Sequence, residues 1–314
     1  MEHSESDFYD YLSRLTKNNR AAAPGDDCAV LNITEPPLLV TVDSLSFQVH
    51  YDSSYRVDEI GQKVVKVNVS DIIAMGGVPC YGLVSYSGFR PVEKVQQLSA
   101  AINRHAREFG VEIIGGDTSN TNNPDEETVG LTLLGRAHPQ GILRRGGAEA
   151  GELLAVSGPL GAAAAVLRSK RSTENRLRKH LYDFPLQPLL GKKLVDAGCR
   201  CATDISDGLI CDLENICRAS RLGAVLNPTK IPVHSTARKL SRTPEAALAV
   251  AVGGGEDYQL LVSLPQTHAA LADELDLTVI GRLTKKLGIN FQPQLPFEKT
   301  PGWKGYDHFK NHDL

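Results

Sequence analysis

Six segments of the chain share one arrangement, in which an acidic residue flanked by glycine or serine follows an apolar run. They are Gly25-Asp26-Asp27, Thr41-Val42-Asp43-Ser44, Ser70-Asp71, Gly115-Gly116-Asp117-Thr118, Asp204-Ile205-Ser206-Asp207-Gly208 and Gly255-Glu256-Asp257. Carboxylates that converge repel one another unless a cation lies between them, and Mg²⁺ with phosphate oxygens suits such a site. Each could instead cap a helix or turn. Six such segments in one chain favour a shared site.

Asp71 occupies the most informative position among these carboxylates. Apolar residues at helical spacing between Val57 and Met75 predict one buried helix face, and Asp71 falls on that face. An isolated buried charge is very costly, so this carboxylate must be paired or must coordinate a metal. A salt bridge or a backbone cap is the alternative.

A second compact group consists of Asp204, Ser206 and Asp207. Strand alternation predicts Asp204 and Ser206 on one face, and Asp207 at the N-cap of a helix that begins at Gly208 or Leu209. A helix N-terminus beside two carboxylates suits a metal-bound phosphate. A simple N-cap is the alternative role for Asp207.

The hydrophobic periodicity predicts a mixed chain of helices and strands. The strands are expected near 38–42, 80–87, 111–114, 128–135, 153–157, 201–206, 258–263 and 277–283, and the helices near 57–75, 92–109, 161–170, 188–197, 209–221 and 243–252. Several strands follow one another without a helix between them, so an α+β fold is favoured over a doubly wound sheet. A Gly-rich, charged stretch at 136–152 predicts domains 1–140 and 141–314, the first rich in strands and the second rich in helices.

Composition excludes several classes of partner. The 314 residues carry a net charge of -3 and only 6% aromatic side chains, which argues against nucleic acid and acidic membranes as partners. The N-terminus is acidic and polar, unlike a secretory signal, so a cytoplasmic location is expected. No P-loop or dinucleotide fingerprint is present. Metals and a few arginines must therefore neutralise any bound nucleotide, with Arg144 and Arg145 as candidates or else as solvated loop charges.

Taken in order, segments along nearly the whole chain resemble the thiamine-monophosphate kinases, a family of the aminoimidazole-ribonucleotide-synthetase-like superfamily. The matching segments are 25–31, 41–43 with His50, 67–77, 114–118, 145–148 before Gly151, 204–209 with Asp212 and Leu213, 254–258, and Gly305-Tyr306-Asp307-His308-Phe309. One such motif is weak evidence, but eight in order are specific.

This resemblance implies a two-domain α+β fold, with an N-terminal mixed α/β domain that forms a homodimer and a C-terminal α+β domain that completes the active site. It implies Mg²⁺-dependent, direct in-line transfer of the ATP γ-phosphoryl group to thiamine monophosphate, which gives thiamine diphosphate. By position, it implies magnesium ligands at Asp27, Thr41, Asp43, Asp71, Asp117, Asp204 and Asp207, ATP contacts at Gly116, Asp117, Arg145 and Ser206, and substrate contacts at His50, Glu256 and Tyr306.

The reaction that the resemblance implies needs no general base. The acceptor is a phosphate monoester whose second pKa is about 6, so it is already anionic near neutral pH. Catalysis should consist of alignment and neutralisation of charge. Two alternatives stay open: another ATP-dependent synthetase of the same superfamily, and a non-catalytic nucleotide-binding paralogue that has diverged at Val42 and Leu189.

Overall fold

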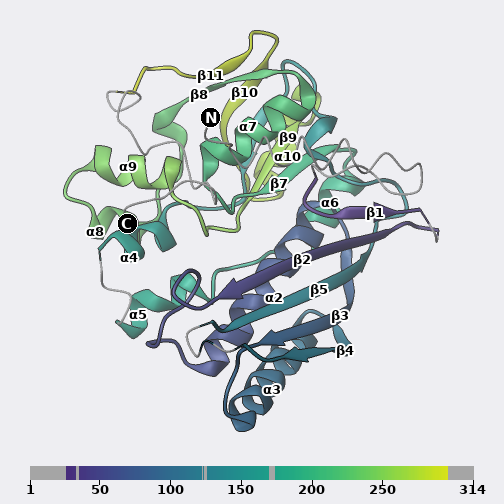
Figure 1. Cartoon of the computed structure of the whole chain (residues 1–314). Helices are drawn as coiled ribbons and strands as arrows, with labels where there is room; N and C mark the ends of the chain where they lie inside the picture. The colour runs from purple at the N-terminus through teal and green to yellow at the C-terminus, as the bar shows by residue number, and fades with distance from the viewer. Residues whose placement is uncertain (1–25, 33–34, 122, 124–125, 170–173, 296–314) are drawn as a thin grey trace, which may run out of the picture.

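The computed structural model describes residues 26–295 except 33–34, 122, 124–125 and 170–173 (Figure 1). Tyr306, which the sequence predicts to contact the substrate, lies outside the described residues. In the described part, two β-sheets are each accompanied by helices. No described helix is both long enough and apolar enough to cross a membrane.

A five-stranded sheet dominates the first half, in the order β1-β2-β5-β3-β4. Its strands are β1 (Ala29–Leu31), β2 (Leu38–Ser46), β3 (Val78–Ser87), β4 (Glu112–Ser119) and β5 (Thr128–Arg136). Only β3 and β4 pair in parallel. The accompanying helices are α2 (Val57–Ala74) and α3 (Val92–Glu108). They pack against each other, and α2 also packs against β2 and β5. The edge strand β4 therefore lies three strands away from β2.

A six-stranded sheet forms the second half, in the order β11-β8-β10-β6-β9-β7. Its strands are β6 (Leu153–Val156), β7 (Cys201–Asp204), β8 (Gly223–Leu226), β9 (Leu260–Leu264), β10 (Thr278–Thr284) and β11 (Gly288–Phe291). The helices of this half are α4 (Ala162–Arg168), α5 (Asn175–Arg178), α6 (Leu190–Asp196), α7 (Leu209–Ser220), α8 (Ser235–Leu240), α9 (Pro244–Gly253) and α10 (Ala269–Glu274). The α+β class is as predicted, and the four strands expected in the second half are present together with two that were not expected. The strands β8 and β11 were not predicted because each begins with a glycine, which in a sequence indicates a turn more than a strand.

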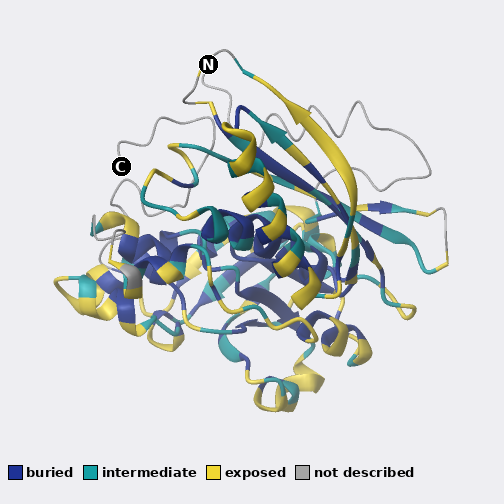
Figure 2. Ribbon diagram, turned by 90° about the horizontal axis from the view of Figure 1, so that it is seen from below, coloured by how far each residue is buried: buried dark blue, intermediate teal, exposed yellow. Residues whose placement is uncertain are grey.

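Helix α2 is buried almost all round (Figure 2). One side lies against the first sheet, and the other packs against β7 and α6 of the second half. The side chain of Glu59 accepts a hydrogen bond from the Arg56 N–H at the start of the helix, and Gly76 follows its end with a φ of 76°. Because neighbours cover both sides, polar residues of α2 become buried groups that require partners.

One hydrophobic cluster crosses from the first half into the second. It joins residues of α2 and β5 with Leu194 of α6 and Val262 of β9. This shared core fixes α2 against β7, and the carboxylates predicted on these two elements are thereby brought together.

Candidate active site

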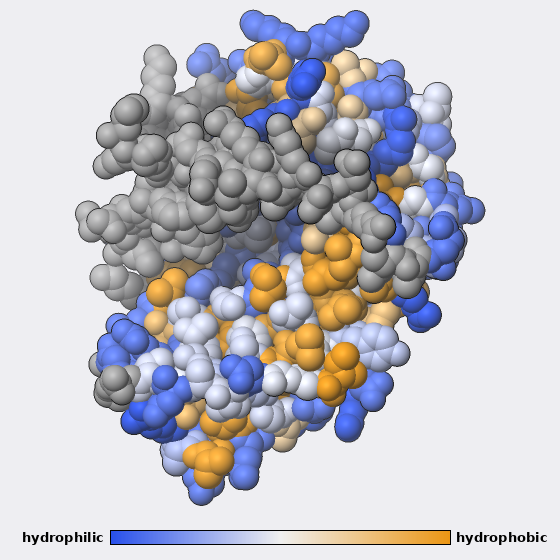
Figure 3. All heavy atoms as spheres, turned by 45° about the vertical axis from the view of Figure 1, so that its right-hand side comes forward, coloured by the Kyte–Doolittle hydropathy of each residue, from blue (hydrophilic) through white to orange (hydrophobic). Residues whose placement is uncertain are grey.

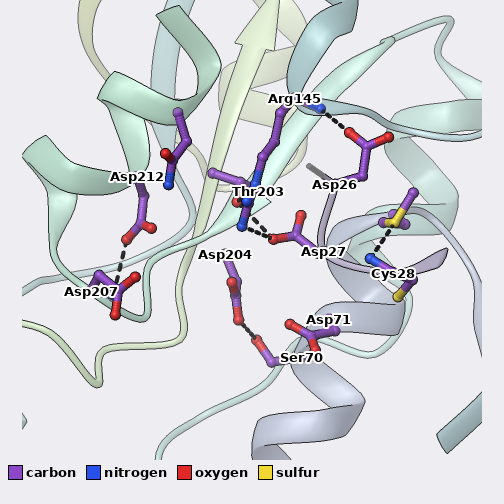
Figure 4. A network of polar contacts seen from close by, with 12 residues as sticks. Asp26, Asp27, Cys28, Ser70, Asp71, Arg145, Thr203, Asp204, Asp207 and Asp212 are labelled. Carbon is purple, nitrogen blue, oxygen red and sulfur yellow. Dashed lines mark hydrogen bonds and ion pairs between the residues drawn. The ribbon is translucent and has the colours of Figure 1, made fainter. Parts of the chain in front are cut away.

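Three carboxylates predicted as metal ligands meet where α2 faces β7. One carboxylate oxygen from each of Asp27, Asp71 and Asp204 lies within 4.8 Å of the other two (Figure 4). Asp27 precedes β1, Asp71 is in the last turn of α2, and Asp204 ends β7. These positions are up to 177 residues apart in the sequence, so tertiary packing alone brings them together.

Short hydrogen bonds from hydroxyl groups hold two of these carboxylates. Thr41 Oγ1 of β2 donates to Asp71 Oδ2 at 2.5 Å. Ser70 Oγ of α2 donates to Asp204 Oδ2 at 2.5 Å. The second bond joins the two halves of the chain at the site itself. Ser70 has no role among the sequence-predicted site residues, although it precedes Asp71 in its motif.

Asp27 is held by Arg145 and Thr203. Arg145, in a short 3₁₀ helix (Arg145–Gly147), donates from Nη2 to Asp27 Oδ1 at 2.6 Å. Thr203 Oγ1 donates to the same oxygen at 2.9 Å. The other oxygen, Oδ2, is buried and has no hydrogen-bond partner among the described residues. Such an oxygen is an acceptor to which a cation could bind.

Burial and mutual repulsion raise the pKa of each carboxyl group. For Asp71, burial raises the pKa well above its usual value, and the charges of Asp43 and Asp204 add to the shift. For Asp204, burial and the charge of Asp27 raise the pKa to about 8. Burial also raises the pKa of Asp27, although Arg145 opposes the shift. The cluster therefore has an excess of negative charge that a cation would relieve.

A dependence of stability on pH follows from these shifts. Asp204 has an unfolded-state pKa near 3.8 and a folded-state pKa of about 8, so the folded chain binds more protons between these values. In EDTA, the free energy of unfolding should therefore fall as the pH rises from about 6 to about 9. With Mg²⁺, which needs deprotonated ligands, the rise in melting temperature on adding metal should instead grow with pH.

Thermal melts across this pH range, with EDTA or Mg²⁺, test the expectation. The Asp204→Asn variant should have a shallower dependence in EDTA because the titrating group is gone. A melting temperature of the wild type that stays constant with pH in EDTA would contradict the raised carboxyl pKa values.

Of two other predicted metal ligands, Asp43 lies near this cluster and Asp117 lies far from it. Asp43, on β2, is near enough for its charge to raise the pKa of Asp71, and its N–H donates to Asn68 Oδ1 of α2 at 2.9 Å. Asp117 is exposed on the edge strand β4, opposite Ser85 of β3. At about 4.8 Å per strand, that edge is roughly 14 Å from β2. Within one chain, the structure does not bring Asp117 to the cluster.

The strand ends expected near residues 42 and 114 were wrong. Asp43 lies within β2 and Asp117 within β4, because each strand continues beyond the apolar run that marks it in the sequence. Gly116 is tightly placed on β4, since a Cβ there would lie 1.9 Å from the Val84 carbonyl oxygen. Only glycine allows this close approach of the two strands.

The group around Asp207 also differs from the prediction. The strand β7 ends at Asp204, so strand alternation does not extend to Ser206. The N-cap of α7 is Gly208, not Asp207. Asp212 Oδ2 accepts the N–H groups of Asp207 and Gly208 at 3.2 and 3.1 Å, which fixes the turn from within α7. Burial and the charge of Asp207 raise the pKa of Asp212 well above its usual value, and sequence analysis assigned this residue no role.

Two residues predicted to bind the substrate, His50 and Glu256, both accept hydrogen bonds from one lysine of α2. Lys63 of α2 donates to Glu256 Oε1 at 2.6 Å and to the His50 carbonyl oxygen at 3.0 Å. His50 Nδ1 accepts the Ser46 N–H at 3.0 Å, which places the ring proton on Nε2. Glu256 N–H donates to the Ser206 carbonyl oxygen at 2.7 Å, so this loop is joined to the turn after β7.

The two halves of the fold, each with its own sheet, correspond to the two domains of one protein family. Residues 25–137 match the model of the AIR synthase related protein N-terminal domain, and residues 149–292 match that of the C-terminal domain. The chain therefore belongs to the AIR synthase related protein family, and its fold is the two-domain α+β fold of that family.

Among the relatives of this chain are thiamine-monophosphate kinases from two organisms. The chain is 30% identical over 295 residues to the thiamine-monophosphate kinase of Pyrococcus horikoshii, covering 93% of this chain and 92% of that protein. It is 32% identical over 308 residues to the thiamine-monophosphate kinase of Escherichia coli K12, covering 91% of each.

Solved structures show the same relationship. A structure of AaThiL complexed with AMPPCP and TMP superimposes with a TM-score of 0.84 at 26% identity, covering 97% of each chain. The hydrogenase maturation protein HypE in complex with ATP has a TM-score of 0.67 at 20% identity, covering 91% of this chain and 93% of that one. The likeness to HypE concerns the fold alone.

Proposed function

We propose that this chain transfers the γ-phosphoryl group of ATP directly and in line to thiamine monophosphate, in a magnesium-dependent reaction that gives thiamine diphosphate. The observation that carries the proposal is the convergence of Asp27, Asp71 and Asp204 between the two halves of the fold. The names of the relatives supply the acceptor, because the carboxylates alone indicate only a phosphate and a cation.

The donor set fits magnesium. Asp27, Asp71 and Asp204 offer converging carboxylate oxygens, one of them buried without a hydrogen-bond partner in the described structure. We propose that these residues, with Thr41, Asp43, Asp207 and Asp117, hold the metal ions. When bound, Mg²⁺ neutralises charge on the phosphate oxygens. Thr41 and Ser70 donate hydrogen bonds that orient Asp71 and Asp204 in advance.

The remaining work of the chain is to align two anionic substrates. The monophosphate of the acceptor is already a nucleophile near neutral pH, so no side chain needs to remove a proton. His50 carries its proton on Nε2 and can donate it in a hydrogen bond to the substrate phosphate. Glu256 and Tyr306 would contact the substrate, and Gly116, Asp117, Arg145 and Ser206 would contact ATP. Holding the two substrates in line and neutralising their charge together supply most of the rate enhancement in such transfers.

We also propose that the chain acts as a homodimer through the first sheet, with a division into domains near residue 140. Helices cover one face of this sheet. Its other face exposes the apolar side chains Val42, Tyr81, Leu83 and Ile114, in the lower part of the molecule where Figure 3 shows hydrophobic residues at the surface. A second copy is the occupant we propose because the resemblance to the kinase family implies a homodimer through the first domain, and this patch lies on the sheet of that domain. The partner would then lie beside Gly116 and Asp117.

Leu83→Glu should convert the dimer to a monomer, because it places a charge in the apolar contact. Light scattering after size-exclusion chromatography measures the mass directly. Leu287→Glu is the matched control, since Leu287 is 69% exposed but belongs to the second half. A wild-type chain that is monomeric at micromolar concentration would contradict the proposal.

A direct assay tests the function. The chain is incubated with ATP, Mg²⁺ and thiamine monophosphate, and the products are separated by chromatography, with thiamine and buffer as controls. Thiamine diphosphate formed from the monophosphate alone supports the kinase. ATP hydrolysis without this product would indicate another ATP-dependent synthetase of the superfamily, and ATP binding without turnover a non-catalytic paralogue. No membrane or nucleic acid partner is proposed, and the cytoplasm is the proposed location.

A further inference from the structure

Lys63 is a buried cation that links the two halves of the fold beside the residues proposed to bind the acceptor. Its side chain is 1% exposed, whereas that of its partner Glu256 is 23% exposed. Its ammonium group donates to Glu256 Oε1 at 2.6 Å and to the His50 carbonyl oxygen at 3.0 Å. One lysine on α2 therefore touches the turn that carries His50 and the loop that carries Glu256.

Backbone hydrogen bonds hold both partners in place, and the Lys63 ammonium group adds one hydrogen bond to each. The His50 N–H donates to the Ser46 carbonyl oxygen at 2.9 Å, which closes the turn after β2. Glu256 has a φ of 63°, and its N–H is bonded to Ser206. The Glu256 side chain, however, is directed by Lys63. Without that ammonium group, the carboxylate would be free to take other rotamers.

The position of Lys63 separates it from the carboxylate cluster. Lys63 and Asp71 are eight residues apart on α2, which corresponds to about 12 Å along the helix axis. The cluster and the Lys63 contacts therefore lie at two places along one rigid helix. A substitution at Lys63 can change the acceptor end of the site while the carboxylates stay in place.

We infer that Lys63 is a positioning residue for the acceptor: it orients Glu256 and the His50 turn so that they bind thiamine monophosphate. This inference rests on the proposed function. Lys63→Met keeps the length and burial of the side chain but removes its charge. It should raise KM for thiamine monophosphate roughly 10- to 100-fold, the loss that is typical when a residue that orients a binding side chain is removed. KM for ATP should stay within about threefold of the wild-type value, because the ammonium group donates to His50 and Glu256 and these residues are proposed to contact the acceptor.

Four further variants separate positioning from a merely structural role. Lys66→Met is the matched control, because Lys66 also crosses from α2 to the second half, where it donates to Asp183 Oδ1 at 2.6 Å and to the Phe184 carbonyl oxygen at 2.8 Å. It should lower the melting temperature without changing KM for thiamine monophosphate. Lys63→Arg, which keeps the charge, should recover part of the affinity. Lys63→Met combined with Glu256→Gln should be little worse than Glu256→Gln alone if Lys63 acts through Glu256.

The wild type is assayed first, so that the two ideas can fail separately. If the wild type forms thiamine diphosphate and Lys63→Met has an unchanged KM for thiamine monophosphate, the inference about Lys63 is overturned and the kinase stands. If the wild type forms no product, the proposed function is overturned. Calorimetric titration of the wild type, Lys63→Met and Lys66→Met with thiamine monophosphate then decides the inference about Lys63. Weaker binding by Lys63→Met than by Lys66→Met supports the inference. Equal binding by the three proteins, or no binding by any of them, overturns it.

Discussion

Asp71→Asn should lower the rate of thiamine diphosphate formation by at least about 100-fold, because it removes a negative ligand from the centre of the carboxylate cluster. The amide has nearly the same shape, and its carbonyl oxygen can still accept the hydrogen bond from Thr41. The buried charge of Asp71 is repelled by Asp43, Asp204 and Asp27. In EDTA, the variant should therefore be at least as stable as the wild type, although it is inactive.

Activity and melting temperature must be measured together on this variant. The rise in melting temperature that Mg²⁺ produces in the wild type should be small or absent in Asp71→Asn. Asp257→Asn is the matched control. Asp257 is also buried, but it accepts the N–H groups of Gly161 and Ala162 at 2.7 and 3.2 Å at the start of α4. Asp257→Asn should be less stable and should still respond to Mg²⁺. An active Asp71→Asn variant would show that the reaction does not need the Asp71 carboxylate.

Arg145→Met should destabilise the chain by about 3–5 kcal/mol, the typical cost of removing one partner of a buried ion pair. Burial by itself would lower the pKa of Arg145, but the charges of Asp27, Asp212 and Asp204 outweigh burial and raise it. This guanidinium group therefore compensates several carboxylates at once. Without it, they would repel one another in a buried site. Mg²⁺ should recover part of the lost stability, because it replaces the missing positive charge.

Arg144→Met is the natural comparison for this variant. Arg144 pairs with Asp26 at 2.8 Å, but its side chain is 37% exposed. Solvent screens such a pair, so the variant should lose less than about 1 kcal/mol. Urea unfolding of both variants, each with EDTA and with Mg²⁺, measures the difference. Equal losses in the two variants, or no recovery of Arg145→Met by Mg²⁺, would argue against a central role for Arg145 in the charge balance of the site.

The amino-acid types and their local order were sufficient to predict the α+β class, most helices and strands, and the carboxylates of the site. Asp71 was identified from helical periodicity alone, because a charge on an apolar face requires a partner. The structure places it beside Asp27 and Asp204, as a shared site requires. Local patterns succeed here because they depend on neighbours within one or two turns of a helix.

Other features depend on contacts between distant segments, and the sequence alone did not reveal them. Asp117 has the same local motif as the other carboxylates, yet sheet order places it on the edge strand β4. Nothing in the residues of β4 indicates from the sequence that this strand lies at the edge of the sheet. Asp212 was named only as part of a matching motif, and its role in fixing the turn before α7 was not predicted because a carboxylate inside an amphipathic helix usually faces solvent.

Lys63 illustrates the same division. In the sequence, it is an ordinary lysine within an amphipathic helix. It becomes a buried link between His50 and Glu256 only because the second half of the chain covers the face of α2 that would otherwise lie in water. The sequence by itself therefore determined which residue types and helices were available. The tertiary structure decided which charges converge, because convergence depends on strand order and on the packing of α2 between the two halves of the fold.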